Sequence, residues 1–362
     1  MNDFVAEPEE LQRAELAAAE RVFQSGVFIL GREVQQFEQD WAGFCGAKCC
    51  VGVANGTEAI ELGLRALDIG PGDEVITTSM TAIATVLAII HAGATPVFAD
   101  IDPATVLLES AAAERQLSPK TKAVLLVHLY GQMPDMQRWV ELCRQTNIHL
   151  LEDCAQSHGA AWDGRHAGTF GTWGAFSFYP TKNLGARGDA GALVTNSQEI
   201  ADRVKALRNC GMHDGREAAE PALNSRLDEL QAAILSVRLK WLHRFNARRQ
   251  EIARTYIAGL VNPKVELLSA PSHSENHVYH LFVVRSDERD RLAEFLKAKG
   301  VQTLVHYPLP AHRHSFHDRM KFTSTELGNA ENHARQCLSL PCHPQLGAGG
   351  VARVIEAINQ FS

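Results

Sequence analysis

Three short segments of the chain carry residues that could bind an anion, a cation and an aldehyde. The first is Asn55-Gly56-Thr57, between a predicted strand that ends at Ala54 and a predicted helix that begins near Glu58. Amides at a helix start attract an anion, and Thr57 can cap the helix. The helix dipole contributes only about 0.3–1 kcal/mol, so tight phosphate binding needs a second contact. Taken alone, the segment is more typical of an ordinary capped turn.

The second segment, residues 152–157, places Asp153 at the end of an apolar strand. A buried carboxylate is costly unless it is paired, so Asp153 either caps a following helix or faces the cation of a ligand. Gln156 lies three residues later and would project from the same site if a helical turn begins there.

The third segment, residues 176–191, places Lys182 just after a strongly apolar strand, among Thr, Asn and Gly residues. A lysine whose pKa is lowered becomes an amine nucleophile that can form a Schiff base, although most surface lysines are simply solvated. Ser177 offers a hydroxyl on the same strand as a second phosphate ligand.

Pyridoxal phosphate contains all three groups that these segments could bind. Its phosphate suits Gly56, Thr57 and Ser177, its pyridinium suits Asp153, and its aldehyde suits Lys182. In parallel α/β sheets ligands bind beyond the carboxyl ends of the strands, where all three segments are expected to lie. Together the segments predict a pyridoxal phosphate site.

Alternating strands and helices are expected to position these segments. The pattern predicts strands near 50–54, 74–78, 95–99, 123–128, 148–151, 174–179 and 191–195. Helices are predicted at 9–23, 33–44, 57–67, 81–91, 109–115, 136–144 and 226–246. Continuous apolar strands separated by helices predict an α/β fold whose mostly parallel sheet is covered on both faces.

A change of pattern after residue 245 predicts a second, smaller domain. A strand is expected at 278–285, helices at 288–299 and 351–361, and a loop rich in Pro and His from His306. We therefore expect an N-terminal arm and large cofactor-binding domain over 1–245, and a small C-terminal α+β domain over 246–362.

Composition excludes several classes of protein. The 362 residues are 45% hydrophobic and 21% charged, and the formal net charge is −7. A negative charge gives no reason to bind nucleic acid, and no segment resembles a signal peptide or a membrane span. We expect a cytoplasmic protein.

Neither group of possible metal ligands predicts a metal site. The cysteines Cys45, Cys49 and Cys50 lack the second half of a zinc site. The histidines His312, His314 and His317 lack a carboxylate partner and a fixed helical spacing.

These segments resemble the DegT/StrS-type (DegT/DnrJ/EryC) sugar aminotransferase family of fold-type I pyridoxal phosphate enzymes. The most specific match is Asp-x-Ala-Gln at 153–156 followed by Ser-Phe-x-x-x-Lys-Asn at 177–183. Further matching segments lie at 25–31, 53–59, 70–75, 128–132, 224–232 and 306–310. The resemblance implies a fold-type I transferase with a mostly parallel sheet in its large domain.

The resemblance also implies a role for each site residue. Lys182 would bond the cofactor aldehyde and move the proton, Asp153 would keep the pyridine nitrogen protonated, and Gln156 would bond the phenolic oxygen. The residues expected at the phosphate are Gly56, Thr57, Ser177 and, from the other subunit of a homodimer, Asn224. His306 and Tyr307 are candidates for substrate contact.

Two positions bear on how closely the chain follows this family. Lys182 stands where the family dehydratases carry histidine. Ala82 stands where the family usually has an aromatic residue that stacks on the cofactor, and Met80 is a conceivable substitute. Loss of that stacking would weaken cofactor binding by about 0.5–1.5 kcal/mol.

The resemblance implies transfer of an amino group from L-glutamate to a keto group of a nucleotide-linked sugar. Residues 276–285 and 300–310 resemble members that aminate carbon 3 of dTDP-3-keto-6-deoxyhexoses. Amination at carbon 4 and a UDP-linked 3-keto sugar are the alternatives. A regulatory protein that binds the cofactor without turnover, and a lyase or dehydratase, are alternatives of other classes.

Overall fold

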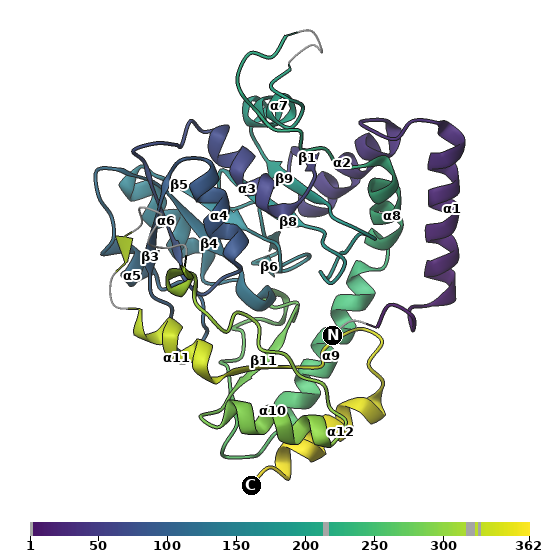
Figure 1. The fold of residues 1–362 in the computed structure, drawn as a ribbon, viewed down its shortest axis with the longest axis vertical. Coiled ribbons are helices and arrows are strands. Elements are labelled where there is room, and N and C mark those ends of the chain that lie inside the picture. The colour runs from purple at the N-terminus through teal and green to yellow at the C-terminus, as the bar shows by residue number, and fades with distance from the viewer. Residues whose placement is uncertain (1–2, 213–216, 316–322, 325–326) are drawn as a thin grey trace.

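Two helices open the chain and each ends at a glycine. The computed structural model describes residues 3–212, 217–315, 323–324 and 327–362 (Figure 1). Helix α1 spans Glu9–Ser25 and α2 spans Arg32–Cys45, as predicted to within two residues at each end. Gly26 (φ 66°) and Gly46 (φ 74°) take the left-handed conformation that terminates them.

A central sheet of eight strands follows, in the order β1-β9-β8-β5-β4-β2-β3-β12. β9 runs antiparallel to both of its neighbours, and the other neighbouring pairs are parallel. The strands are β1 (Cys49–Val53), β2 (Glu74–Thr78), β3 (Thr95–Ala99), β4 (Thr121–Val127), β5 (His149–Asp153), β8 (Trp173–Ser177), β9 (Gly191–Thr195) and β12 (Thr323–Ser324). The predicted mostly parallel sheet is confirmed.

Helices cover both faces of this sheet (Figure 1). One face packs on α3 (Gly56–Arg65), α4 (Ile83–His91) and α7 (Gln198–Leu207). The other packs on α2, α5 (Ser110–Glu114), α6 (Met136–Thr146) and α8 (Glu229–Leu239). Along β2, Val75 belongs to the first core and its neighbour Ile76 to the second, because successive strand residues point to opposite faces.

Three predictions from the sequence are corrected. Helix α7 was not predicted, although Ser197 caps it by accepting from the Ile200 amide at 3.3 Å. The single helix expected over 226–246 is two helices, α8 and α9 (Leu242–Gly259), because the Trp241 amide bonds the Arg238 carbonyl in a tighter turn. The strand expected at 278–285 is only β11 (Phe282–Arg285), since Tyr279 has a left-handed backbone (φ 46°).

A second, antiparallel sheet lies in the C-terminal part and consists of β10 (Glu266–Leu267), β11 and β13 (Cys337–Leu340). It packs with α10 (Arg289–Ala298), α12 (Ala348–Asn359) and the part of α9 from Ile252 onwards. The remaining elements are the hairpin β6 (Ala161–Trp162) and β7 (Arg165–His166), and α11 (Gly328–Gln336). A domain boundary near residue 245 stays a prediction.

Within the described ranges, no helix combines the length and the apolar character that crossing a membrane requires.

Candidate active site

Lys182 lies five residues beyond the end of β8, in a turn closed by its own amide bonding the Tyr179 carbonyl at 2.9 Å. The residue is partly exposed, but burial of its ammonium group lowers the pKa to about 8, against a smaller opposing effect of the Asp153 charge. Burial lowers the pKa values of three nearby imidazoles, those of His158, His280 and His306. The charge of Lys182 lies close enough to lower these pKa values further. The site therefore surrounds an amine with neutral rings.

The start of α3 and the end of β8 meet in a tight cradle. A Cβ atom on Gly56 would lie 2.6 Å from the Cβ of Ser177, and one on Gly191 would lie 2.4 Å from the carbonyl carbon of Asn55. The predicted cap is wrong: Asn55 caps α3 by accepting from the Glu58 amide at 2.9 Å, and Thr57 lies inside the first turn. The structure thus brings Gly56 and Ser177 together, with Thr57 following Gly56 in the chain; their role at a phosphate stays a prediction.

Asp153 ends β5 and is 6% exposed. Its Oδ2 accepts from the Thr85 hydroxyl at 2.7 Å and its Oδ1 from the Ala155 amide at 3.1 Å. Residues 154–160 form turns, so the reading of Asp153 as a helix cap is wrong. The carboxylate is held at the carboxyl end of its strand, close enough to affect the pKa of Lys182.

Gln156 joins the loop after β5 to the C-terminal part of the chain. Its Oε1 accepts from the Tyr130 amide at 2.7 Å, and its Nε2 donates to the Tyr307 hydroxyl at 2.9 Å. Burial, with a contribution from the Asp153 charge, raises the pKa of Tyr307 to about 12. The predicted residues Gln156 and Tyr307 are therefore direct neighbours.

A cavity of about 320 Å³ is lined by Thr181, the residue that precedes Lys182. His306 lines it and bonds the Ser339 hydroxyl at 2.7 Å, and burial lowers its pKa to about 4. Sequence reasoning missed the buried His280, which also lines this cavity, although it lies in the 276–285 stretch that resembles the carbon-3 members of the family. His158 was also missed, although it directly follows the segment that contains Asp153 and Gln156.

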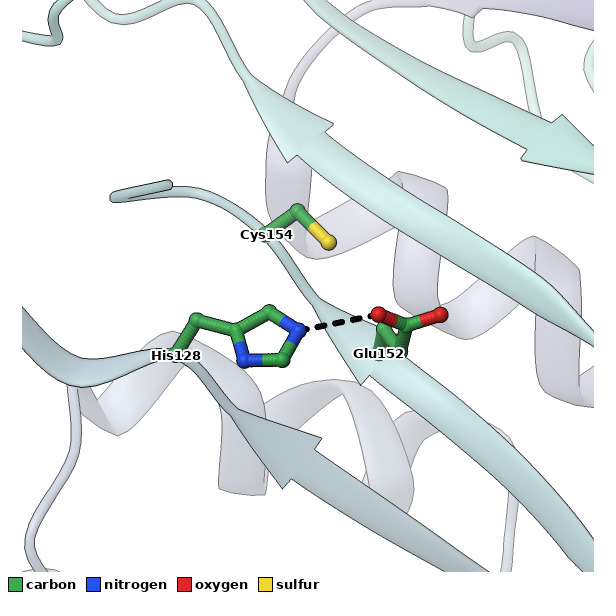
Figure 2. A group of neighbouring side chains, drawn as sticks. All are labelled: His128, Glu152 and Cys154. Carbon is green, nitrogen blue, oxygen red and sulfur yellow. Dashed lines mark hydrogen bonds and ion pairs between the residues drawn. The ribbon is translucent and has the colours of Figure 1, made fainter. Parts of the chain in front are cut away.

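His128, Glu152 and Cys154 lie close enough to suggest a metal site, but their bonds argue for structure (Figure 2). Glu152 Oε2 contacts His128 Nε2 at 2.9 Å. The carboxylate also accepts three backbone amides at 2.8 Å, those of Gly168, Phe170 and Gly171. Burial raises the pKa of the Cys154 thiol well above its usual value, and a protonated thiol is a poor ligand. Glu152 therefore fastens the 168–171 loop to β5, and His128 bonds the same carboxylate.

Of the three histidines weighed as metal ligands in the sequence, His312 bonds Glu331 at 3.0 Å. Glu331 is thus a carboxylate partner for His312 that the neighbouring sequence did not show. Arg313 bonds the same carboxylate. His317 lies outside the described residues.

Comparison with known proteins decides the family. The model of the DegT/DnrJ/EryC1/StrS aminotransferase family matches residues 9–359. The chain belongs to this family. It is 45% identical over 95% of its length to the dTDP-3-amino-3,6-dideoxy-alpha-D-galactopyranose transaminase of Aneurinibacillus thermoaerophilus, and covers 94% of that protein. It is 42% identical over 99% of its length to the dTDP-3-amino-3,4,6-trideoxy-alpha-D-glucose transaminase of Streptomyces venezuelae, and covers 95% of it.

The crystal structure of S. venezuelae DesV in complex with a ketimine intermediate has the same fold. The two superpose with a TM-score of 0.95 at 42% identity, over 99% of this chain and 96% of the other. The predicted fold-type I aminotransferase architecture and the predicted family are therefore confirmed.

The residues of this family member fit pyridoxal phosphate. The Gly56–Ser177 cradle has no room for a Cβ at Gly56, as backbone that closes around a phosphate requires. The buried carboxylate of Asp153 lies at the end of β5, the strand next to β8. The amine of Lys182, whose pKa is lowered, lies just beyond β8. Each group of the cofactor thus has a counterpart.

The structure also places three further residues that were singled out from the family pattern. Met80 is fully buried in a core with Val86 and Phe98, and Ala82 is the partly exposed residue at the start of α4. Asn224 is exposed, while its neighbour Ser225 accepts from the Ala54 amide at 3.2 Å, at the end of β1.

Proposed function

We propose that this protein is a pyridoxal phosphate-dependent transaminase that moves the amino group of L-glutamate to carbon 3 of a dTDP-linked 3-keto-6-deoxyhexose. The observation that carries the proposal is the position of Lys182, an amine of lowered pKa, beside Asp153 and the cradle at Gly56. The likeness to two dTDP-3-amino-sugar transaminases supports the choice of substrate.

Each predicted residue has a place in this reaction. Gly56, Thr57 and Ser177 hold the phosphate, with amides of the α3 start as donors. Asp153 holds a proton on the pyridine nitrogen. Gln156, whose Oε1 accepts from the Tyr130 amide, donates from its Nε2 to the phenolic oxygen. The bound cofactor supplies the electron sink that stabilises a carbanion.

Lys182 binds the cofactor and then moves the proton in both halves of the reaction. A pKa of about 8 leaves about one tenth of the amine unprotonated at pH 7, far more than an ordinary lysine, so the group can both accept and donate a proton. The rings of His158 and His280, whose pKa values are lowered by burial and by the Lys182 charge, add no positive charge beside it. Glutamate leaves as 2-oxoglutarate, and the sugar carbonyl oxygen leaves as water.

The substrate side of the site is assigned to His306 and Tyr307. Both lie in one loop beside Lys182, and the neutral, partly apolar lining of the adjacent cavity suits a deoxy sugar. His306 is held by Ser339, so its ring is already oriented. Neither residue supplies a charge for the diphosphate.

We infer that the working unit is a homodimer in which Asn224 contacts the cofactor phosphate bound by the partner. Asn224 is exposed, next to a serine anchored at the end of β1. Exposed apolar side chains in the α1–α2 connection, Val27, Phe28 and Ile29, supply a surface for the second copy. Mixing the inactive variants Lys182→Ala and Asn224→Ala tests this, because each mixed dimer has one site with both an intact Lys182 and an intact Asn224. Activity should therefore return in the mixed dimers. Stable mixed dimers that stay inactive would contradict the inference.

An amino-transfer assay tests the proposed reaction. Purified protein with pyridoxal phosphate and ¹⁵N-glutamate is offered dTDP-3-keto-6-deoxyhexose, the corresponding dTDP-4-keto sugar and a UDP-linked 3-keto sugar, with Lys182→Ala as control. We expect ¹⁵N in the dTDP-3-keto product alone. Labelling of only the 4-keto or UDP-linked sugar would overturn the substrate assignment. No labelling of any sugar, with no conversion of glutamate, would favour the regulatory alternative.

A further inference from the structure

Tyr130 has a backbone conformation that is unusual for a large side chain. It lies in a single 3-10 turn, Leu129–Gly131, after β4, with φ 61° and ψ 3°. A left-handed conformation at such a residue costs about 1–3 kcal/mol and persists only where the surrounding structure holds it. This turn aims the Tyr130 amide at Gln156 Oε1, 2.7 Å away.

The next residue makes the close approach between this turn and the Gln156 segment possible. Gly131 has φ 93°, and a Cβ there would lie 2.8 Å from the Gln156 carbonyl oxygen. The turn and the loop after β5 are therefore in direct backbone contact.

The Tyr130 amide fixes which way the Gln156 side chain faces. Since an N–H donor must meet the oxygen of the amide, the nitrogen must point the other way. Gln156 Nε2 has two N–H groups, and one donates to the Tyr307 hydroxyl at 2.9 Å. The second is available as a donor to a ligand.

The Tyr130 side chain is held by a residue far along the chain. Its hydroxyl lies 2.9 Å from Nε2 of His333 on α11, and the two residues are 2% and 1% exposed. Burial lowers the pKa of His333 to about 3 and raises that of Tyr130, so this is a hydrogen bond between neutral groups. An unmade bond here would leave two buried polar groups unpaired.

We propose that Tyr130 and His333 are positioning residues that hold the strained turn, so that Gln156 presents its amide N–H to the phenolic oxygen of the cofactor. The proposal rests on the proposed function, because it deepens the role given there to Gln156. Both residues act through Gln156, and α11 thereby contributes to the site from the opposite end of the chain.

The test is a pH titration of the absorbance of bound pyridoxal phosphate in Tyr130→Phe, His333→Leu and the double variant. A donor at the phenolic oxygen favours loss of the proton held there, so a loosened Gln156 raises the midpoint. We expect a rise of about half a pH unit in each single variant. The double variant should rise no further, because both substitutions delete the same bond.

Tyr256→Phe is the matched control. Tyr256 is also fully buried, and its hydroxyl bonds the Pro341 carbonyl at 2.8 Å, so the variant loses a comparable bond elsewhere. It should lower stability with an unchanged midpoint. Asp153, Lys182 and Tyr307, the charged or titratable groups around Gln156, are the same in every variant.

Unchanged midpoints in the two single variants would overturn the proposal and leave the pair a merely structural contact. Additive shifts in the double variant would also contradict it. If His333→Leu does not fold, Tyr130→Phe decides the matter, because it removes a single oxygen atom. If the unsubstituted protein shows no absorbance of bound pyridoxal phosphate at any pH, the proposed function and this inference fail together. A normal titration of the unsubstituted protein with unchanged midpoints in the variants defeats the inference alone.

Discussion

Gly56 and Ser177 approach so closely that a Cβ added to the glycine would lie 2.6 Å from the serine Cβ. Gly56 opens α3 and Ser177 ends β8, so the contact joins a helix start to the carboxyl end of a strand. No non-glycine residue fits at 56 without displacing one of these elements. The pair defines the phosphate cradle of the proposed cofactor site.

Replacing Gly56 with alanine should therefore weaken cofactor binding. The added methyl group must displace Ser177 or α3, and we expect the dissociation constant of pyridoxal phosphate to rise about 10-fold or more, which corresponds to about 1.4 kcal/mol. Gly43→Ala is the control, since a Cβ there meets nothing within 4 Å. Equal affinities of the two variants would contradict the cradle.

Asp153→Asn should lower both the pKa of Lys182 and the rate of amino transfer. The Asp153 charge raises the Lys182 pKa, so its removal moves the amine titration below pH 8. Loss of the charge that keeps the pyridine nitrogen protonated should reduce turnover about 100-fold or more. Amine titration by pH-dependent chemical labelling of the apoprotein checks the first effect, and kcat checks the second. An upward shift of the amine titration would refute the assignment.

Lys182 should also make the stability of the apoprotein depend on pH. Its pKa falls from 10.5 to about 8 on folding, so between these values the unfolded chain binds more protons than the folded one. The contribution of Lys182 to the free energy of unfolding of the apoprotein therefore rises as pH increases from about 8 to 10.5. Urea unfolding of wild type and Lys182→Met across this range measures the effect. The stability difference between the two proteins should move in favour of wild type as pH rises, and a constant difference would count against a lowered pKa.

A buried ionic cluster ties the N-terminal arm to the loop that carries Lys182. Glu15 bonds Arg238 at 2.5 Å and Arg187 at 2.6 Å, and Glu7 bonds the same two arginines. Glu15→Ala leaves Arg187 and Arg238 to share the carboxylate of Glu7, so one positive charge loses its counter-charge, and the variant should be destabilised by at most about 3–5 kcal/mol. Glu9→Ala removes an exposed pair with Arg13 and should cost at most about 1 kcal/mol. Urea midpoints of the two variants compare them; a similar small loss in both would show that the cluster is not stabilising.

The sequence was most informative where function depends on residues close together in the chain. Asp153 and Gln156 share one segment, and Ser177 and Lys182 share another, so each pair was predicted from its own spacing. Short continuous apolar runs separated by helical segments predicted the sheet, because both are local properties of the sequence.

Contacts between distant segments could not be predicted in this way. Gln156 and Tyr307 are 151 residues apart, and Tyr130 and His333 are 203 apart. Their meeting depends on how the C-terminal part packs on the central sheet, which no local pattern encodes. The same holds for the cap of α3, where Asn55 and Thr57 are equally suitable residue types and only the backbone geometry decides.

The central claim, that Lys182 bonds the cofactor, is tested most directly by borohydride reduction of the protein loaded with pyridoxal phosphate, followed by mass analysis of its peptides. Reduction converts the bond between amine and aldehyde into a stable one, so the label stays on the lysine that formed it. We predict a pyridoxyl group on the peptide that contains Lys182, and no label at this position in Lys182→Ala. A label on another lysine, or none on the loaded wild-type protein, would contradict the account.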